Sequence, residues 1–464
     1  MLTAAALPEL ATREIQVPRY RHATAPGVVH VGLGAFHRAH QALVFDDLLS
    51  RGDARWGVFG VAMHNPAVAA ALEQQDRLYA VRIASASESG WRICGAIART
   101  CVAALSPDNV LRAIAADSTR WITLTVTEKA YAAPLADLIV RGLAARRAAG
   151  QGGLTIASCD NLSGNGRQLQ MLCVQAAREK DDGLASWIDA TCAFPNSMVD
   201  RIVPAASEAT ALAAREALGV ADHAALRTEA FWEWVIERRF VDDADGDALQ
   251  SVGVQVVEDV APFEVAKLRL LNGAHSALAC IGAVAALPVI SECIGQTVLR
   301  AYVHGLMTRE VGPLLKRPGW QAYRDALLTR FANPSLQHSV HQIASDSSQK
   351  IPQRWVPSAL DALAHGLGVD HLAFAAAAWM RYCQAHDEDG AAYTINDPLA
   401  NTLHALAATH RGDAHATFNA LGTLNAVWGT ELPAQLVWRD AVIAHLQAIH
   451  THGVLGAVAR MDNN

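Results

Sequence analysis

The sequence has no pair of cysteines at the C-x-x-C spacing, although it contains eight cysteines. Without such pairs, neither a zinc knuckle nor a thioredoxin-type redox site is expected. The cysteines lie among mostly apolar neighbours, which is typical of buried free thiols in a reducing compartment. The chain is also short of positive charge, because 38 Lys and Arg stand against 45 Asp and Glu. The resulting net charge of -7 argues against a nucleic-acid or anionic-membrane surface.

Long apolar runs are missing as well. The N-terminal stretch contains acidic residues and lacks the apolar core of a secretory signal. The apolar segment 275–290 is interrupted by Gly and Pro and is shorter than a membrane span. We therefore expect a cytoplasmic protein that has neither a membrane nor a nucleic-acid partner.

The length and composition of the chain suit two globular cores. The 464 residues are 52% hydrophobic and 18% charged, so there is too little charge for disorder. In the first half, short apolar and β-branched runs alternate with helical segments, which predicts parallel βαβ units. These strand candidates lie in 27–33, 56–63, 120–131 and 152–162. From about Pro262 the chain becomes rich in Ala and Leu with helical periodicity. The predicted fold class is α/β, with a Rossmann-type doubly wound sheet in 1–262 and a mostly α-helical domain in 263–464.

A Gly-Leu-Gly sequence stands where a dinucleotide-binding loop is expected. Gly32 and Gly34 follow the first predicted strand and precede a helix, so Gly32 would permit a tight turn and Gly34 a close approach to a pyrophosphate. His37 occupies the place of the third glycine, and a purely structural turn explains the pattern equally well. The second strand ends without a carboxylate, which leaves Asn65 as the candidate for a ribose hydroxyl. Since no cation for a 2′-phosphate is evident, NAD is favoured over NADP as the cofactor.

Three different polar side chains occur on the apolar segment that follows Pro262. In an α-helix, Lys267 and Asn272 would lie about 140° apart, and Lys267 and His275 about 80° apart. Oxidation of a secondary alcohol requires a base for the hydroxyl proton and donors for the developing alkoxide. A lysine with a lowered pKa, an amide donor and an orienting histidine meet these needs. The alternative is a surface lysine, a solvent-facing asparagine and a satisfied core histidine.

Further polar residues stand at predicted strand ends, where doubly wound sheets bind ligands. Glu128 either relays protons to Lys267 or contacts the cofactor, or it belongs to a solvated strand end. Asp160 and Asn161 follow another strand, and a functional role is favoured there. Another group either shapes the pocket or forms a structural ion pair and cap; it comprises Asn196, Asp200 and Arg201.

Another set of candidates lies near residue 350. His338, Lys350 and Arg354 are candidates for contacts with substrate hydroxyls or a carboxylate, and Lys350 is the first choice for a carboxylate. His37 and His40 are spaced like metal ligands, but no third ligand accompanies them. No metal is therefore expected.

Several segments in order along the chain resemble one family, the mannitol dehydrogenase family of polyol-specific long-chain dehydrogenases. The segments are HVGLGAFHRAHQ, TVTEKAY, SCDNLSGNG, FPNSMVDRIVP, FEVAKLRLLNGAHS and DSSQKIPQRW. The stretches QIASDSSQKIPQR and AAAWMRYCQAHDEDG look closer to its fructuronate reductase (D-mannonate oxidoreductase) branch.

The resemblance implies metal-independent hydride transfer with NAD and assigns roles to the residues. Lys267 would be the general base in oxidation and the acid in reduction. Asn272 and Asn161 would stabilise the oxyanion, and His275 would orient the substrate oxygen. The run beside the nicotinamide and pyrophosphate would comprise Ala35, Phe36, His37 and Arg38.

Two departures from the family pattern bear on structure and substrate. Ser347 stands where the family usually has Gly, so we expect the local loop to differ. Gln342 stands where mannitol dehydrogenases tend to carry Arg, which argues against mannitol. The leading hypothesis is interconversion of D-mannonate and D-fructuronate by a monomer or small homo-oligomer. The alternatives are oxidation of a neutral polyol, mannitol or arabinitol, and a catalytically silent NAD-binding protein.

Overall fold

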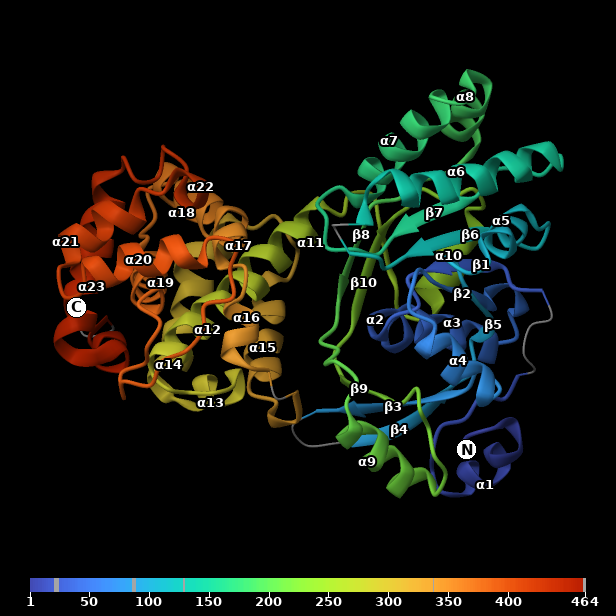
Figure 1. Ribbon diagram of the computed structural model, residues 1–464, viewed down its shortest axis with the longest axis horizontal. Coiled ribbons are helices and arrows are strands. Elements are labelled where there is room, and N and C mark those ends of the chain that lie inside the picture. Colours follow the sequence, from blue (N-terminus) through green and yellow to red (C-terminus); the bar gives the residue numbers. More distant parts are fainter. Residues whose placement is uncertain (21–24, 86–88, 128–129, 337, 462–464) are drawn as a thin grey trace. The chain divides into compact units, whose positions relative to one another are not determined.

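The computed structural model describes residues 1–20, 25–85, 89–127, 130–336 and 338–461. Within these ranges the chain forms two compact units, Met1–Ala261 and Pro262–Asn464. Figure 1 shows that the first unit contains β-sheets covered by helices, whereas the second is built from helices. The predicted fold class, a doubly wound sheet followed by a mostly helical region, is confirmed.

The first unit is organised around a five-stranded sheet with the order β5-β2-β1-β6-β7. Its strands are β1 (Val28–Val31), β2 (Val58–Ala62), β5 (Ile97–Val102), β6 (Trp121–Leu124) and β7 (Thr155–Ser158). All neighbouring strands are parallel. Along the chain these are the third, second, first, fourth and fifth strands of the sheet, which is the Rossmann order.

The two faces of this sheet are covered by different helices (Figure 1). Because side chains alternate along a strand, Val28 of β1 packs on one face, and Val29 and Val31 pack on the other. The Val28 face is covered by α3, and the opposite face by α5 to α8. This two-sided burial explains why the central strands read as continuous apolar runs. The helices of this unit are α1 (Leu7–Thr12), α2 (Ala35–Ala39), α3 (Gln41–Ser50), α4 (Ala67–Gln74), α5 (Pro107–Ala115), α6 (Ala133–Ala148), α7 (Asn165–Arg178), α8 (Asp182–Thr191), α9 (Glu208–Leu218) and α10 (Ala244–Ser251).

Two small three-stranded sheets complete the first unit, with the orders β4-β3-β9 and β11-β10-β8. Their strands are β3 (Tyr79–Ala84), β4 (Ser89–Cys94), β8 (Ser197–Asp200), β9 (Leu226–Glu229), β10 (Glu233–Glu237) and β11 (Gln255–Val257). The sequence analysis did not identify these strands, nor β5. All of them except β11 carry a charged side chain, so they lack the continuous apolar runs that mark the central strands.

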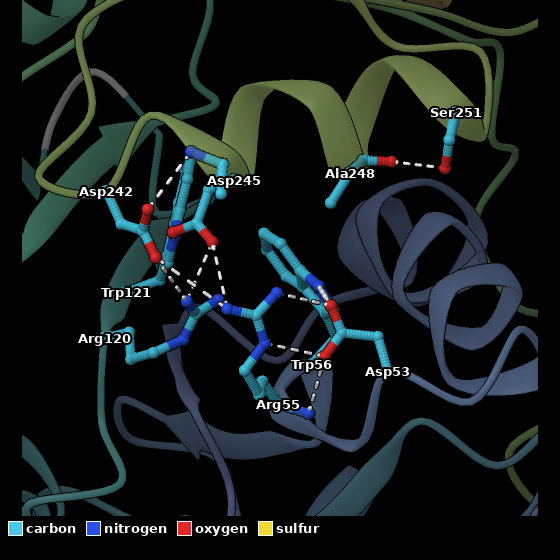
Figure 2. Close-up of polar contacts among 10 residues, drawn as sticks. Asp53, Arg55, Trp56, Arg120, Trp121, Asp242, Asp245, Ala248 and Ser251 are labelled. Carbon is cyan, nitrogen blue, oxygen red and sulfur yellow. Dashed lines mark hydrogen bonds and ion pairs between the residues drawn. The ribbon is translucent and has the colours of Figure 1, made fainter.

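A group of ion pairs closes the amino-terminal edge of the main sheet (Figure 2). Asp245 on α10 is buried, and its Oδ2 accepts a hydrogen bond of 2.7 Å from the Trp121 indole. Its Oδ1 lies 2.8 Å from the guanidinium of Arg120, the residue before β6. Arg55 adds a bidentate contact to Asp53. These contacts fasten α10 to the start of β6, at the edge opposite Gly32.

The second unit has no named strand among the residues that the structure describes. Its α-helices are α11 (Ala261–Ala266), α12 (Ala274–Val284), α13 (Ile290–Gly295), α14 (Thr297–Gly305), α15 (Trp320–Phe331), α16 (Val340–Ala344), α17 (Ser347–Arg354), α18 (Val356–Ala364), α19 (Asp370–Tyr382), α20 (Ala400–Thr409), α21 (Ala414–Thr417), α22 (Asn425–Trp428) and α23 (Leu436–Met461). Helices α12 and α19 pack together and are buried almost throughout. They form the core of the unit, as their Ala-rich apolar sequences require.

Helix α23 is the one described helix that is long and apolar enough by composition to cross a membrane. Gly453 has φ 72° and ψ 165°, which interrupts the helix. Glu388 Oε1 accepts a hydrogen bond from the backbone N–H of Val454, at the start of the second part. The helix packs against α19. Of its most apolar stretch of 18 residues, 39% is buried within the unit.

We expect Asp245→Ala to lower the free energy of unfolding by about 3–5 kcal/mol, because it leaves a partly buried guanidinium without its buried partner. The midpoint and slope of urea unfolding, followed by tryptophan fluorescence, measure the change. Asp247→Ala is the matched control on the same helix. The Asp247 side chain is 77% exposed and lies 3.3 Å from Arg238, so its loss should cost at most about 1 kcal/mol. Equal midpoints for the two variants would contradict the structural role given to Asp245.

Candidate active site

The predicted dinucleotide loop lies at the carboxyl ends of β1 and β6, where the strand order reverses. This switch point is where open α/β sheets bind ligands. Gly32 has φ 105°, a conformation that favours glycine. A Cβ at Gly32 would lie 2.2 Å from the carbonyl oxygen of Thr125, so no larger residue fits. The backbone of β1 therefore approaches the end of β6 very closely at this point.

Gly34 has a different environment. Its N–H donates a hydrogen bond of 2.6 Å to the Gly32 carbonyl, and the residue precedes the first turn of α2. A Cβ at Gly34 would meet only the Gly32 oxygen, at 3.7 Å, so the outer side of this residue is open. A backbone that turns tightly at Gly32 and stays uncovered at Gly34 fits a dinucleotide phosphate group.

The residues after Gly34 differ in accessibility. Ala35 and Phe36 are half-buried, whereas His37 and Arg38 are buried. The Arg38 guanidinium donates to the carbonyls of Gly34, at 3.3 Å, and Ala224, at 2.6 Å. Arg38 thus ties the loop to the segment before β9. Cofactor contacts by these four side chains remain a prediction.

The two other predicted cofactor residues are Asn65 and Glu128. Asn65 lies in the exposed loop after β2, and its Oδ1 accepts a hydrogen bond of 2.9 Å from the N–H of Ala67. This contact starts α4 and leaves the amide nitrogen for another role. Glu128 lies outside the residues that the structure describes.

Asp160 joins the ends of two neighbouring strands. Its carboxylate accepts hydrogen bonds from the backbone N–H of Val126, at 3.3 Å, and Thr127, at 2.9 Å, and from the Tyr131 hydroxyl, at 3.0 Å. Thr127 has φ 74°, so this carboxylate holds the turn after β6 in a strained conformation. Asn161 follows it, exposed, at the same edge of the sheet. The oxyanion role of Asn161 remains a prediction.

The group around Asn196 makes internal contacts. The Asn196 amide donates to Glu237 Oε1 at 2.8 Å, and the Arg201 guanidinium donates to the carbonyls of Ala39 and Glu229, at 2.7 and 2.8 Å. Burial lowers the pKa of Arg201 to about 10. Of the two alternatives left open by the sequence, these contacts favour the structural one for Asn196 and Arg201.

In the second unit, the segment Lys267–Gly273 between α11 and α12 is a π-helix. Its hydrogen bonds join residues five apart, and such turns are frequent at functional sites. The predicted separation of about 140° between Lys267 and Asn272 assumed an α-helix. A π-helical turn contains more residues than an α-helical turn, because each hydrogen bond spans five residues. Two residues five apart, such as Lys267 and Asn272, therefore lie nearer the same side of the helix. The structure thus places the lysine and the amide closer together than the sequence analysis expected.

The π-helical segment is held by side chains from the end of α17. The Arg354 guanidinium donates to the Asn272 carbonyl at 3.3 Å and to Ser276 Oγ at 2.6 Å. The Trp355 indole donates to the Gly273 carbonyl at 3.0 Å. Arg354, a candidate substrate residue, therefore also positions the backbone of Asn272.

The His275 ring stacks against two neighbouring rings. Its imidazole lies 5.0 Å from the Phe331 ring and 5.5 Å from the His338 ring, centroid to centroid. Burial is the main cause that lowers the pKa of His275 well below its usual value, and the nearby His338, Arg354, Arg330 and Lys350 lower it further. His275 is therefore neutral near pH 7. The same groups create a positive potential at its ring.

Lys350 lies on α17, one turn before Arg354. Its ammonium donates to the carbonyls of Ile343, at 3.1 Å, and Ser345. Burial, and next the neighbouring Arg354, lower the pKa of Lys350 below its ordinary value. The lysine is thus positioned by the backbone of α16 and the turn that follows it.

The Ser347 departure does not produce strain at that residue. The positive φ of 52° belongs to Asp346, and Ser347 is the first residue of α17. The Ser347 hydroxyl donates to Asp397 Oδ2 at 3.1 Å and accepts a hydrogen bond of 2.8 Å from the Trp379 indole. The serine therefore ties the start of α17 to the core helix α19, which a glycine could not do.

The second unit thus gathers His275 with His338, Lys350 and Arg354. The sequence analysis missed Phe331 and Arg330 of α15, which also belong to the surroundings of His275. A buried arginine beside a phenylalanine carries no local signal, because its proximity to His275 results from tertiary packing. No group of three His, Cys, Asp or Glu placed to hold a metal ion is found among the described residues.

We expect Trp355→Phe to lower the free energy of unfolding by about 1 kcal/mol more than Trp438→Phe. Both indoles are buried, but Trp438 Nε1 has no hydrogen-bond partner among the described residues, so the control loses volume without losing a hydrogen bond. Urea unfolding gives the difference. Hydrogen exchange should also speed up across 267–273 only in Trp355→Phe. Identical exchange in both variants would show that this indole does not support the π-helix.

Comparisons with known proteins agree with these features. Residues 26–245 match the model of the mannitol dehydrogenase Rossmann domain, and residues 259–450 match that of the mannitol dehydrogenase C-terminal domain. A D-mannonate oxidoreductase of Escherichia coli (strain K12) is 36% identical over 471 residues, covering 94% of this chain and 95% of that protein. A mannitol 2-dehydrogenase of Pyrenophora tritici-repentis (strain Pt-1C-BFP) is 36% identical over 432 residues, covering 85% of this chain and 76% of that protein.

Two solved structures are similar over almost their whole length. The ternary complex of Pseudomonas fluorescens mannitol 2-dehydrogenase with NAD and D-mannitol has a TM-score of 0.85 and 30% identity, covering 100% of this chain and 99% of that chain. A substrate-free D-sorbitol dehydrogenase has a TM-score of 0.84 and 29% identity, covering 99% of this chain and 100% of that chain. Both units are matched in sequence and in fold, and the chain is an oxidoreductase that belongs to the mannitol dehydrogenase family.

Proposed function

We propose that this chain interconverts D-mannonate and D-fructuronate with NAD, using Lys267 as the general acid and base. The observation that carries the choice of an anionic substrate is the cationic environment of His275, to which Lys350, Arg354 and Arg330 contribute. The D-mannonate oxidoreductase among its relatives, 36% identical, supports the same choice.

The cofactor is assigned to the first unit. The tight turn at Gly32 and the open side of Gly34 suit a dinucleotide, and the similar mannitol 2-dehydrogenase structure contains NAD. NAD supplies the hydride acceptor for oxidation of the alcohol carbon. We propose residues 1–262 as the NAD-binding domain and 263–464 as the substrate domain.

The acid–base work is assigned to the π-helical segment. Lys267 would take the proton from the substrate hydroxyl in oxidation and return it to the carbonyl oxygen in reduction. The Asn272 amide, placed closer to Lys267 by the π-turn, would donate a hydrogen bond to the same oxygen while it carries negative charge. His275, whose pKa is lowered mainly by burial, would stay neutral and orient that oxygen without adding charge.

The carboxylate of a hexonate or hexuronate distinguishes it from a polyol. Lys350 is our first choice for its partner, because a cation and a carboxylate form a strong hydrogen bond in a partly buried site. The ammonium already lies against the carbonyls of Ile343 and Ser345, so little further ordering is required. Arg354 is shared between Ser276 and the Asn272 carbonyl, and we assign it a supporting contact.

The second candidate is a mannitol 2-dehydrogenase that oxidises a neutral polyol to its ketose. The relative of that name is also 36% identical, and the similar solved complex contains D-mannitol. Under this hypothesis the cations near His275 would bind hydroxyl groups. Lys267, Asn272 and His275 are all present, which disfavours a catalytically silent NAD-binding protein.

We propose a soluble enzyme of the cytoplasm that acts on small molecules; its eight buried free cysteines fit a reducing compartment, and its net charge of -7 disfavours a nucleic-acid partner. We propose that it works without nucleic-acid or membrane partners, as a monomer or small homo-oligomer.

We expect Lys267→Ala to lower kcat for oxidation at neutral pH by at least about a hundredfold, which is typical for loss of a general base. Initial rates of NADH formation measure this change. Lys180→Ala is the control, since Lys180 forms a surface ion pair with Asp137, and its kcat should match that of the wild type. A kcat for Lys267→Ala near the wild-type value would exclude this lysine as the base.

The substrate is decided by comparing NADH-dependent reduction of D-fructuronate and D-fructose. We expect fructuronate to saturate the enzyme at lower concentration and with faster turnover. Lys350→Gln should raise KM for fructuronate by at least about tenfold, the loss of one charged hydrogen bond, and affect fructose far less. The exposed Lys316→Gln serves as the control. Faster turnover of fructose, with a lower KM, would instead establish the polyol reaction.

A further inference from the structure

His30 is a histidine at the centre of the main sheet. It lies on β1, fully buried, and pairs in register with Gly60 of β2 and Thr123 of β6. A histidine here is costly unless its nitrogens have partners. Nδ1 lies 2.8 Å from Thr123 Oγ1, and Nε2 lies 3.0 Å from the Gly32 carbonyl and 2.9 Å from Thr125 Oγ1. Both nitrogens are therefore satisfied, and two of the three partners are at the switch point.

The partners determine which nitrogen carries the hydrogen. A backbone carbonyl can only accept, so His30 Nε2 must be the donor to Gly32. In a neutral ring Nδ1 is then the acceptor, and the Thr123 hydroxyl donates to it. Burial lowers the pKa of His30 to about 3, so the ring keeps this neutral form in neutral solution.

The Gly32 carbonyl receives three hydrogen bonds. Besides His30 Nε2, the Thr125 hydroxyl donates to it at 2.8 Å and the Gly34 N–H at 2.6 Å. The peptide that it begins is planar, so fixing the oxygen also fixes the Leu33 N–H. That N–H donates to the Val61 carbonyl at 3.1 Å. The peptide between Gly32 and Leu33 is thus held from both sides.

Neighbouring residues also pack against the loop 32–34 and against His30. A Cβ at Gly60 would lie 2.8 Å from Leu33 Cδ1, so the glycine leaves room for the loop residue. From α2, the His37 ring stacks on His30 with centroids 3.3 Å apart and an interplanar angle of 11°. Burial and the neighbouring His30 lower the pKa of His37 well below its usual value, so the stacked pair carries no charge. The contacts of His30 with the Gly32 carbonyl and the His37 ring thus link it to the loop, beyond what burial in the sheet alone requires.

We propose that His30 is a positioning residue for the dinucleotide, which holds the Gly32 carbonyl through Nε2–H and thereby sets the loop 32–34 for binding. The inference rests on the proposed use of this loop for NAD. His30 itself touches neither cofactor nor substrate in this proposal. It acts by fixing a backbone that would otherwise have to be ordered when the cofactor binds.

Three variants of the full-length protein test the proposal. His30→Leu fills the space without a donor, and His30→Gln restores an N–H near the place of Nε2. Val29→Ala, on the same strand but on the opposite face, controls for a general loss of stability. The measurements are the Kd for NAD by titration calorimetry, the thermal midpoint, and hydrogen exchange of residues 32–36 in cofactor-free protein.

We expect His30→Leu to raise the Kd for NAD by at least about tenfold, as expected for loss of a buried hydrogen bond, and to speed exchange in 32–36. KM for the sugar substrate at saturating NAD should stay unchanged. His30→Gln should recover most of the affinity, and Val29→Ala should bind NAD normally even where its thermal midpoint falls as far. The proposal is overturned if folded His30→Leu binds NAD as the wild type does, or if Val29→Ala weakens binding equally. A wild-type protein that bound no NAD would overturn the proposed function instead.

Discussion

The hydrogen bonds from Arg354 and Trp355 to the carbonyls of Asn272 and Gly273 are the contacts on which the candidate site in the second unit depends. They bind the end of α17 to a π-helical turn, and that turn brings Lys267 and Asn272 towards one side. Because Lys350 lies one turn earlier on α17, the same helix positions the lysine proposed for a carboxylate. Displacing this helix would therefore disturb both the acid–base pair and substrate recognition, although α17 contains neither Lys267 nor Asn272.

In the first unit, too, side-chain hydrogen bonds fix the backbone of the candidate site. A backbone carbonyl, that of Gly32, is held by the side chains of His30 and Thr125 and by the Gly34 N–H. Asp160 similarly fixes the backbone N–H groups after β6. In both units the groups that we propose to meet ligands lie on backbone segments with unusual geometry, and polar side chains fix that geometry. Such polar contacts reduce the ordering that ligand binding would otherwise require.

The sequence was informative where the signal is local. The apolar β-branched runs, the Gly32–Gly34 pattern and the change to helical periodicity near Pro262 led to the correct fold class. The π-helix could not be predicted, because an apolar segment does not reveal whether its turns hold an extra residue. The sequence indicated a different local loop at Ser347, and the structure places the positive φ one residue earlier, at Asp346. Phe331 and Arg330 were missed because only tertiary packing brings α15 to His275.

Chemical rescue tests most directly whether Lys267 transfers the proton. Lys267→Ala would be assayed for mannonate oxidation with increasing methylamine at fixed ionic strength and pH. We predict that the rate rises in proportion to the concentration of free amine, while the wild-type rate does not change. A variant whose rate without amine stays near that of the wild type, or one whose rate is unaffected by amine although it binds NAD normally, would contradict this role of Lys267.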